Sequence, residues 1–175
     1  MTANNASDVL SEGFRRLEQL LDEQCVHYRR IEEIVESQRE SLRGADVETL
    51  VALSAEERGL LEKIRVIDHR RVELASAIAS EIGITTQSSP ALSDLIEHSG
   101  PRRSRLVTIA DELRQLIAKT RAASRVVRTA AEGLARHMQG IVQSVEQGLS
   151  RSGIYERTGR IVSGPPRHSA LDIRS

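Results

Sequence analysis

The sequence predicts an all-α protein: an elongated antiparallel helical hairpin and a long C-terminal helix, which together form a three-helix, coiled-coil-like bundle. Over most of the 175 residues, apolar side chains recur at alternating steps of three and four. This spacing places them on one face of a helix. Gly44-Ala45-Asp46 interrupts the pattern, which resumes directly afterwards in the same style. Such a short interruption is typical of a turn between two antiparallel helices.

The first helix is expected to begin at Ser7, a residue type that caps helix N-termini, and to end before the turn. Gly44 is expected to take the left-handed conformation that closes this helix. Its seam has apolar residues at eight of ten positions. The seam consists of Leu10, Phe14, Leu17, Leu21, Gln24, Tyr28, Ile31, Val35, Gln38 and Leu42.

The second helix is expected to be capped by Asp46 and to end near Gly83, so that the hairpin spans residues 7–82. Four seam positions of the hairpin are polar, and we expect them to fix register and partner choice at some cost in stability. They are Gln24, Gln38, Glu57 and Arg71. The second seam consists of Leu50, Leu53, Glu57, Leu60, Ile64, Ile67, Arg71, Leu74, Ile78 and Glu81.

Residues 83–103 combine glycine, serine and two prolines, and are predicted to connect the hairpin to the C-terminal helix. A short helix from about Ala91 to His98 fits inside this connector. Pro90 is suited to the start of a helix, and Gly100-Pro101 to its end.

The C-terminal helix is predicted over residues 104–150, where the seam restarts at Leu106. Its second half contains Gly133, Gly140 and Gly148, each of which costs about 1 kcal/mol of helix stability relative to alanine. Residues 151–175 carry proline, serine and glycine without periodicity, and this tail is predicted to be disordered.

The composition, 39% apolar and 29% charged, is that of a soluble folded protein. Cys25 is the single cysteine, so no intramolecular disulfide can form. The N-terminal stretch lacks the pattern of a signal peptide, and no run approaches the roughly 18 apolar residues of a membrane span. We therefore expect no membrane span and a cytoplasmic protein.

The charge is divided unevenly along the chain. Residues 1–100 carry 19 acidic and 11 basic residues, and residues 101–175 carry 6 and 14. A basic half can bind nucleic acid, but the sequence offers no aromatic residues among its arginines for base stacking. We therefore expect no nucleic-acid partner, and favour an acidic hairpin packed against a basic helix.

Motifs for catalysis or metal binding are not found in the sequence. It has no glycine-rich phosphate loop, no HExxH and no nucleophile in a recognisable setting. Glu23 with His27, and His69 with Glu73, share helix faces, but we interpret both as solvated charge pairs. No catalytic residue, metal or cofactor is expected, and an enzyme is disfavoured because a thin bundle offers no enclosed pocket.

Several segments, in this order, resemble the FlgN-type export chaperones of the bacterial flagellum. They are "QRESLRGADVETL" across the turn, "LLEKI" and "RR" on the second helix, and "YERTG" at residues 155–159. The resemblance covers about residues 10–160. One departure lies at "TRAASRVVRTAAEGL", where family members often have asparagines early in the C-terminal helical region.

The resemblance implies a small cytosolic helical chaperone that binds the disordered terminal region of hook-associated proteins at the hook–filament junction. It would prevent their premature assembly and deliver them to components of the type III export apparatus. The C-terminal helical region would bind the substrate. The sequence itself agrees, because an apolar stripe weakened by glycines is expected where a partner completes folding. This stripe consists of Val127, Ala130, Leu134, Met138, Ile141, Val145 and Leu149.

Two alternatives remain open from the sequence. The protein could instead be a structural coiled-coil scaffold that self-associates, whereas we expect an export chaperone to be a monomer or weak dimer when free.

The role of Tyr155 is the second open alternative. Tyr155 could cap the end of the long helix, or Ile154 and Tyr155 could form a docking element for the export apparatus, with an aromatic anchor supplying the binding energy.

Overall fold

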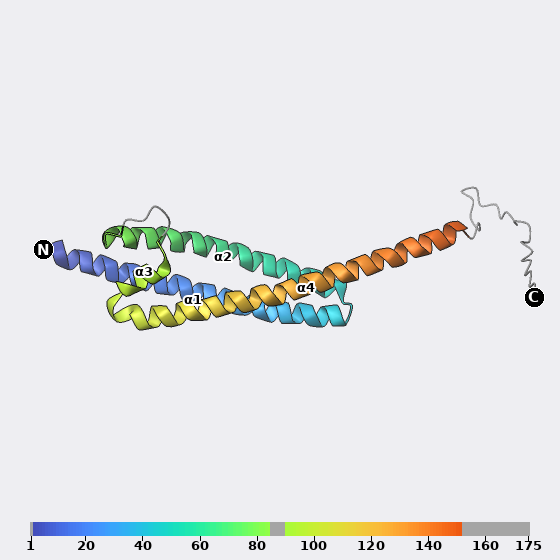
Figure 1. Ribbon diagram of the computed structural model, residues 1–175, viewed down its shortest axis with the longest axis horizontal. Helices are drawn as coiled ribbons and strands as arrows, with labels where there is room; N and C mark the ends of the chain where they lie inside the picture. The colour runs from blue at the N-terminus through green and yellow to red at the C-terminus, as the bar shows by residue number, and fades with distance from the viewer. Residues whose placement is uncertain (1, 85–89, 152–175) are drawn as a thin grey trace, which may run out of the picture. The chain divides into compact units, whose positions relative to one another are not determined.

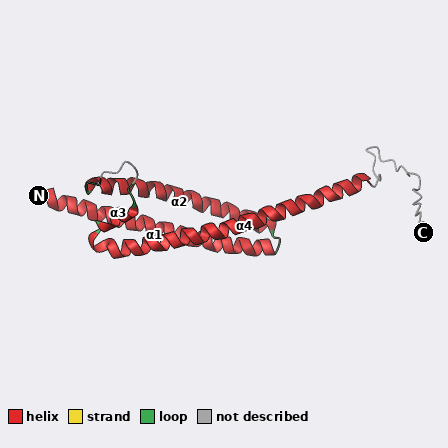
Figure 2. Ribbon diagram, viewed as in Figure 1, coloured by secondary structure: helices red, strands yellow, loops and turns green. Residues whose placement is uncertain are grey.

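The computed structural model describes residues 2–84 and 90–151, with side chains described for 8–84 and 90–148. These residues form α1 (Thr2–Arg43), α2 (Val47–Glu81), α3 (Leu92–Glu97), the 3-10 turn η1 (Gly100–Arg102) and α4 (Arg103–Arg151) (Figure 1). The described ranges contain helices and loops but no strand (Figure 2). The predicted all-α class is confirmed.

The chain divides into two compact units, residues 1–130 and 131–175, and α4 contributes to both. In the first unit, α1 and α2 lie side by side in antiparallel orientation, and the first half of α4 runs along α1 (Figure 1). This is the predicted hairpin with a third helix packed against it.

The start and end of α1 differ from the prediction. The helix begins at Thr2, so Ser7 lies inside it and does not cap it, since no glycine or proline stops the helix earlier. The left-handed residue is Ala45, with a φ of 54°, and not Gly44. Helical hydrogen bonding continues through Gly44, whose N–H donates to the Glu40 carbonyl at 3.0 Å. The turn is therefore displaced by one residue.

Hydrogen bonds around this turn form a Schellman motif. The Asp46 N–H donates to the Ser41 carbonyl at 2.8 Å, and the Ala45 N–H donates to the Leu42 carbonyl at 3.3 Å. This pairing satisfies carbonyls that the helix end leaves without partners. It requires a positive φ at the second residue after the helix, which is here Ala45.

The predicted ends of α2 are confirmed. The Asp46 carboxylate accepts a hydrogen bond from the Thr49 N–H at 3.0 Å. Hydrogen bonding from the Thr49 side chain, and then from its backbone, lowers the pKa of Asp46. At the other end Gly83 has a φ of 76°. The Ile84 N–H donates to the Ala79 carbonyl at 2.9 Å, so a second Schellman motif closes α2.

The predicted short helix lies at the expected place. α3 spans Leu92–Glu97, with Ala91 and His98 as its flanking cap residues, and Pro90 precedes the N-cap. Leu95 and Ile96 are buried against the hairpin, so the connector contributes to the core. Residues 85–89 of the connector lie outside the described residues.

Two apolar clusters hold the first unit together, and both are mainly aliphatic. The larger one unites all four α-helices, and Gly13 permits a close approach in it because an added Cβ would lie 3.1 Å from Ile78 Cγ1. The buried side chains of the larger cluster are Phe14, Leu17, Leu21, Cys25, Ala75, Ile78, Ala79, Leu95, Ile96, Leu106, Ile109, Ala110 and Leu113. Those of the smaller cluster, further along the bundle, are Ile31, Ile34, Val35, Leu60, Ile64 and Val127.

Two of the four polar seam residues join the helices. Gln38 Nε2 donates to Glu57 Oε2 at 3.0 Å, and Ser124 Oγ donates to Glu57 Oε1 at 3.1 Å, so that α1, α2 and α4 share one polar layer. Arg71 instead pairs with Asp68 on its own helix at 2.7 Å. Gln24 is buried, and its Oε1 has no hydrogen-bond partner among the described residues.

Ion pairs between α1 and α4 join the acidic and the basic part of the chain. Basic side chains of η1 and α4 pair with carboxylates of α1, as the sequence predicts. In one further pair the basic residue lies on α1 and the carboxylate on α4. Because the pairs follow the same order along both helices, α4 runs parallel to α1. The pairs are Arg102–Glu18, Arg105–Asp22 and Lys119–Glu32, and in the opposite sense Arg29–Glu112.

Replacing Ala45 at the hairpin tip by glycine should stabilise the protein. Ala45→Gly removes a left-handed alanine and should raise the free energy of unfolding in denaturant by about 1 kcal/mol. Gly44→Ala is the matched control, because its added Cβ would meet the Glu40 carbonyl oxygen at an ordinary 3.6 Å. A loss of stability in Ala45→Gly would contradict the left-handed assignment.

Removing the shared carboxylate of the polar layer should destabilise the bundle. Glu57→Ala leaves Ser124 Oγ without its acceptor and Gln38 Nε2 with only the longer bond to Ser54 Oγ at 3.4 Å, at a cost of about 2 kcal/mol in chemical denaturation. Glu57→Gln keeps one acceptor and should cost less. A double-mutant cycle of Glu57→Ala with Ser124→Ala measures the coupling, and strictly additive effects would show that the layer does not form.

Candidate functional site

The candidate site is the second half of α4, residues 131–148, which belongs to the second unit. Its backbone is helical throughout, even though Gly133, Gly140 and Gly148 lie in the helix interior. Apolar residues recur here at steps of three and four, so they share one face of the helix. This face is the predicted binding stripe.

The structure places the predicted stripe residues in two different settings. Val127 is only 7% exposed and belongs to the smaller apolar cluster, where it packs in the bundle core. Ala130 is exposed and Leu134 is half-buried. Met138, Ile141 and Val145 are about half exposed, at 51%, 51% and 55%. Leu149 lies in the helix by its backbone, and its side chain is not described.

Val142, at 55% exposed, belongs to the same surface and is missing from the predicted stripe. Its neighbour Ile141 is a seam residue, and the adjacent position widens the apolar face beyond a two-position seam. An apolar residue directly after a seam position was the signal that could have identified it. We call Leu134, Met138, Ile141, Val142 and Val145 the apolar face of α4.

The three glycines of this segment have no packing role inside the described chain. A Cβ added at Gly133, Gly140 or Gly148 would meet no atom within 4 Å, in contrast to Gly13 in the bundle. Each glycine therefore lowers helix stability without permitting a close contact within the described residues. The segment is a weak helix that presents apolar side chains to solvent.

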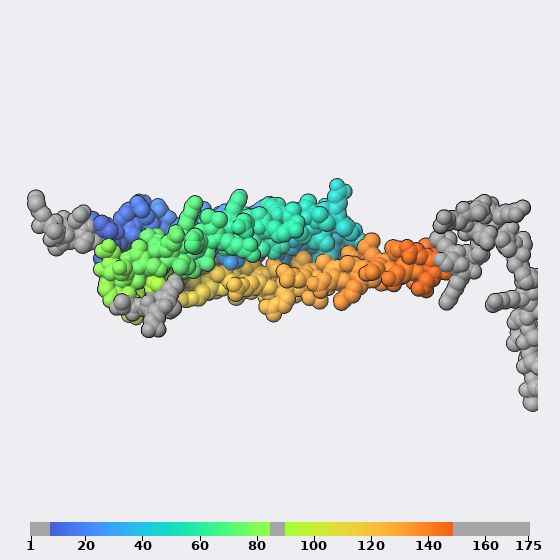
Figure 3. All heavy atoms as spheres, turned by 90° about the horizontal axis from the view of Figure 1, so that it is seen from above, coloured from blue at the N-terminus to red at the C-terminus, as the bar shows by residue number. Residues whose placement is uncertain are grey.

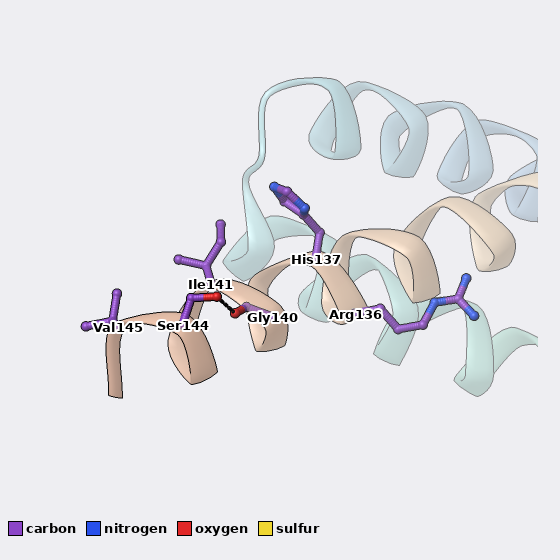
Figure 4. Close-up of a pocket in the computed structure, with 6 residues that line it drawn as sticks. All are labelled: Arg136, His137, Gly140, Ile141, Ser144 and Val145. Atoms are coloured by element: carbon purple, nitrogen blue, oxygen red, sulfur yellow. Dashed lines mark hydrogen bonds between the residues drawn. The ribbon is translucent and has the colours of Figure 1, made fainter. Parts of the chain in front are cut away.

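A hollow of about 590 Å³ lies along this segment, lined by Arg136, His137, Gly140, Ile141, Ser144 and Val145 (Figure 4). Its apolar side is formed by Ile141 and Val145. The Ser144 hydroxyl donates to the Gly140 carbonyl at 2.8 Å, as the figure shows, so the hydroxyl is engaged by its own helix. The lining combines the apolar side chains of Ile141 and Val145 with polar side chains, as protein-binding surfaces do.

The described residues offer little for catalysis or metal binding. They contain no group of three or more histidine, cysteine or acidic side chains that could hold a metal ion. Burial raises the pKa of the Cys25 thiol, which makes it a poor nucleophile. His69 and Glu73 form the expected solvent-exposed pair, 3.4 Å apart. What the apolar face of α4 offers is surface for burial against a partner.

Ile154 and Tyr155, the predicted docking element, lie outside the described residues, as does the tail after Arg151 that is predicted to be disordered. The structure therefore does not test either prediction. No helix in the described part of the chain is long and apolar enough to cross a membrane.

Comparison with protein families gives a match over most of the chain. The family model described as FlgN protein matches residues 13–163, which include most of the hairpin and all of α3 and α4. No curated protein and no solved structure matches the chain. The matched range contains both the packed bundle and the apolar face of α4.

Proposed function

The chain belongs to the FlgN family of flagellar export chaperones, and we propose that it binds the disordered terminal helical region of hook-associated proteins. Through this binding it prevents premature assembly and delivers these subunits to the type III export apparatus. The chaperone binds and delivers these subunits in the cytoplasm. FlgN is a family of chaperones and not of enzymes, which agrees with a site built for burial.

The observation that carries the proposal is the exposed apolar face of α4. Four large apolar side chains, Met138, Ile141, Val142 and Val145, are each about half exposed on consecutive turns of one helix. Apolar side chains scattered singly over a surface need no explanation, but a contiguous row marks an interaction site. An amphipathic substrate helix laid along this row would bury both apolar faces.

Burial supplies the binding energy in this proposal. The stripe residues beyond Val127, at partial burial, contribute on the order of 10 kcal/mol before the costs of ordering, at about 25 cal/mol per Å². These costs include fixing a substrate segment that is disordered when free. Affinities between micromolar and nanomolar follow from the difference.

The glycines also affect the free energy of substrate binding, because they lower the stability of the free helix. A helix weakened by Gly133, Gly140 and Gly148 opens readily when its apolar face has no partner, and is completed when a substrate covers it. Val127 remains packed in the bundle core and anchors the start of this segment. We infer that substrate contacts begin beyond Val127 and extend from Ala130 to Leu149.

Self-association through the same apolar face is the alternative, in which the protein acts as a coiled-coil scaffold. Sedimentation of the purified chain separates the two functions. A monomer or weak dimer that forms a stable heterodimer with a co-expressed hook-associated protein supports the chaperone. Concentration-dependent oligomers that never form such a complex support the scaffold.

A charge placed on the apolar face should abolish substrate binding. Ile141→Asp would bury an unpaired carboxylate in the complex, so co-purification of the hook-associated protein should be lost while hairpin stability is unchanged. Gln143→Asp is the matched control, because Gln143 is exposed on the opposite side of the same helix. Normal binding by Ile141→Asp would contradict the proposed site.

Docking to the export apparatus is proposed to use Ile154 and Tyr155. Tyr155→Ala should then bind substrate at normal affinity and keep the stability of the parent, yet fail to support export, because it lacks an aromatic anchor. Secretion of the hook-associated protein measures this. Normal export would refute docking, and a loss of about 1 kcal/mol or more in stability would assign Tyr155 to the packed structure instead.

A further inference from the structure

A second apolar surface lies within the first unit, along the groove between α2 and the first half of α4. Two hollows of about 490 Å³ and about 360 Å³ follow each other along it. They share Tyr28, Leu61 and Arg121 among their lining residues, so they form one continuous groove. α2 and α4 border this groove side by side in Figure 3. The apolar face of α4, residues 134–145, is not part of it.

The floor of the groove is formed by α1 and its walls by α2 and α4. Leu21, Gln24 and Tyr28 lie on the floor, and Ile64 and Leu113 are among the apolar wall residues. On α4 the lining runs from Ala110 to Arg128. At 1.5 Å per residue this length is about 27 Å, which matches a helix of about 18 residues. The groove corresponds to the open position of a four-helix bundle.

A buried polar atom on the floor lacks a partner. Gln24 is 4% exposed, lines the groove, and its Oε1 accepts no hydrogen bond within the described residues. A buried acceptor without a donor is costly, and such groups in folded proteins normally have one. An occupant of the groove that donates a hydrogen bond to this atom, once the Gln24 side chain turns toward the groove, would remove this cost.

Arginines border the groove on its α4 side. Arg121, Arg125 and Arg128 are exposed, and their spacing of four and three places them in one row on the helix. None of the three forms an ion pair with another described residue. Asp68 and Glu57, the acidic residues of the lining, are already engaged by Arg71 and by the polar layer. The unpaired charge along the groove is positive.

We propose that this groove binds an acidic amphipathic helix of a partner protein, which completes a four-helix bundle. Its apolar stripe covers Leu61, Ile64 and Leu113, and a side-chain amide or hydroxyl within the stripe donates to Gln24 Oε1. Carboxylates at i, i+4 and i+7 on one flank pair with Arg121, Arg125 and Arg128. This site is separate from the apolar face of α4 and does not depend on the function proposed for that face.

A nucleic acid would also meet the arginine row but does not fit the floor. Phosphate groups at neutral pH offer only acceptors, so they cannot satisfy Gln24 Oε1. The apolar walls would stay exposed beside a phosphate backbone. The row is also short, and the sequence supplies no interleaved aromatic residues for base stacking.

The test uses synthetic peptides with the full-length protein. The first is a fluorescent amphipathic helix of about 18 residues with leucines at heptad spacing, one central glutamine in the stripe and glutamates on one flank. The second has lysine at each glutamate position, and the third has leucine for the central glutamine. A short DNA duplex serves as the nucleic-acid probe, and fluorescence anisotropy measures each affinity.

The glutamate peptide should bind at least about tenfold more tightly than the lysine peptide, as three exposed charge pairs would give. The triple variant Arg121→Glu, Arg125→Glu, Arg128→Glu should reverse this preference. Gln24→Leu should reverse the preference for the central glutamine over leucine. Ile141→Asp should leave peptide binding unchanged, because it alters only the apolar face of α4.

Three results would overturn the proposal: equal binding of the glutamate and lysine peptides, no binding of either peptide at millimolar concentration, or DNA that binds more tightly than the glutamate peptide and displaces it. Circular dichroism of each variant shows whether the bundle is intact. Because the three arginines are exposed, their reversal should leave the helical signal unchanged.

Discussion

The bundle depends on the apolar side chains of α1, which are shared between two neighbouring helices. Leu17, Leu21 and Cys25 lie in one cluster with Ile78 of α2 and Ile109 of α4. A face this wide arises because positions beside the predicted seam, such as Cys25 and Ile34, are buried as well. A strict two-position seam serves one partner, whereas this wider face serves two. The antiparallel turn holds α2 against this face of α1, and the ion pairs hold α4 against it.

The two halves of α4 differ in what surrounds their apolar side chains. Up to Val127 the seam residues are covered by α1 and α2, and α4 is stabilised by packing. Beyond Val127 none of the described side chains is buried, and three glycines weaken the helix. One continuous helix therefore combines a packed part with a part whose apolar face lacks a partner among the described residues. This division is the physical basis of the proposed chaperone function.

Heptad spacing and cap residues predicted the helices and most of their ends, because these depend on neighbouring residues. Asp46 and Gly83 were identified in this way. The left-handed position was predicted at Gly44 and found at Ala45, since the last helical hydrogen bond of α1 reaches one residue further than composition suggests. Cap preference alone does not determine where hydrogen bonding stops.

The site was only partly predictable for a different reason. The stripe follows from spacing, but Val127 lies in the core and Val142 joins the surface, because burial depends on where neighbouring helices end. The groove between α2 and α4 was not predicted at all. It depends on which helices pack against each other and which do not, and on an unpaired Gln24 oxygen that only a folded chain reveals.

The central claim is that the second half of α4 is completed by a substrate, and amide hydrogen exchange on the full chain tests it most directly. Exchange would be compared between the free protein and its complex with a co-expressed hook-associated protein. The account predicts weak protection at residues 131–148 in the free chain and a large gain in the complex, with little change in the core of the hairpin. Strong protection of this segment in the free monomer, or a gain confined to the hairpin, would contradict it.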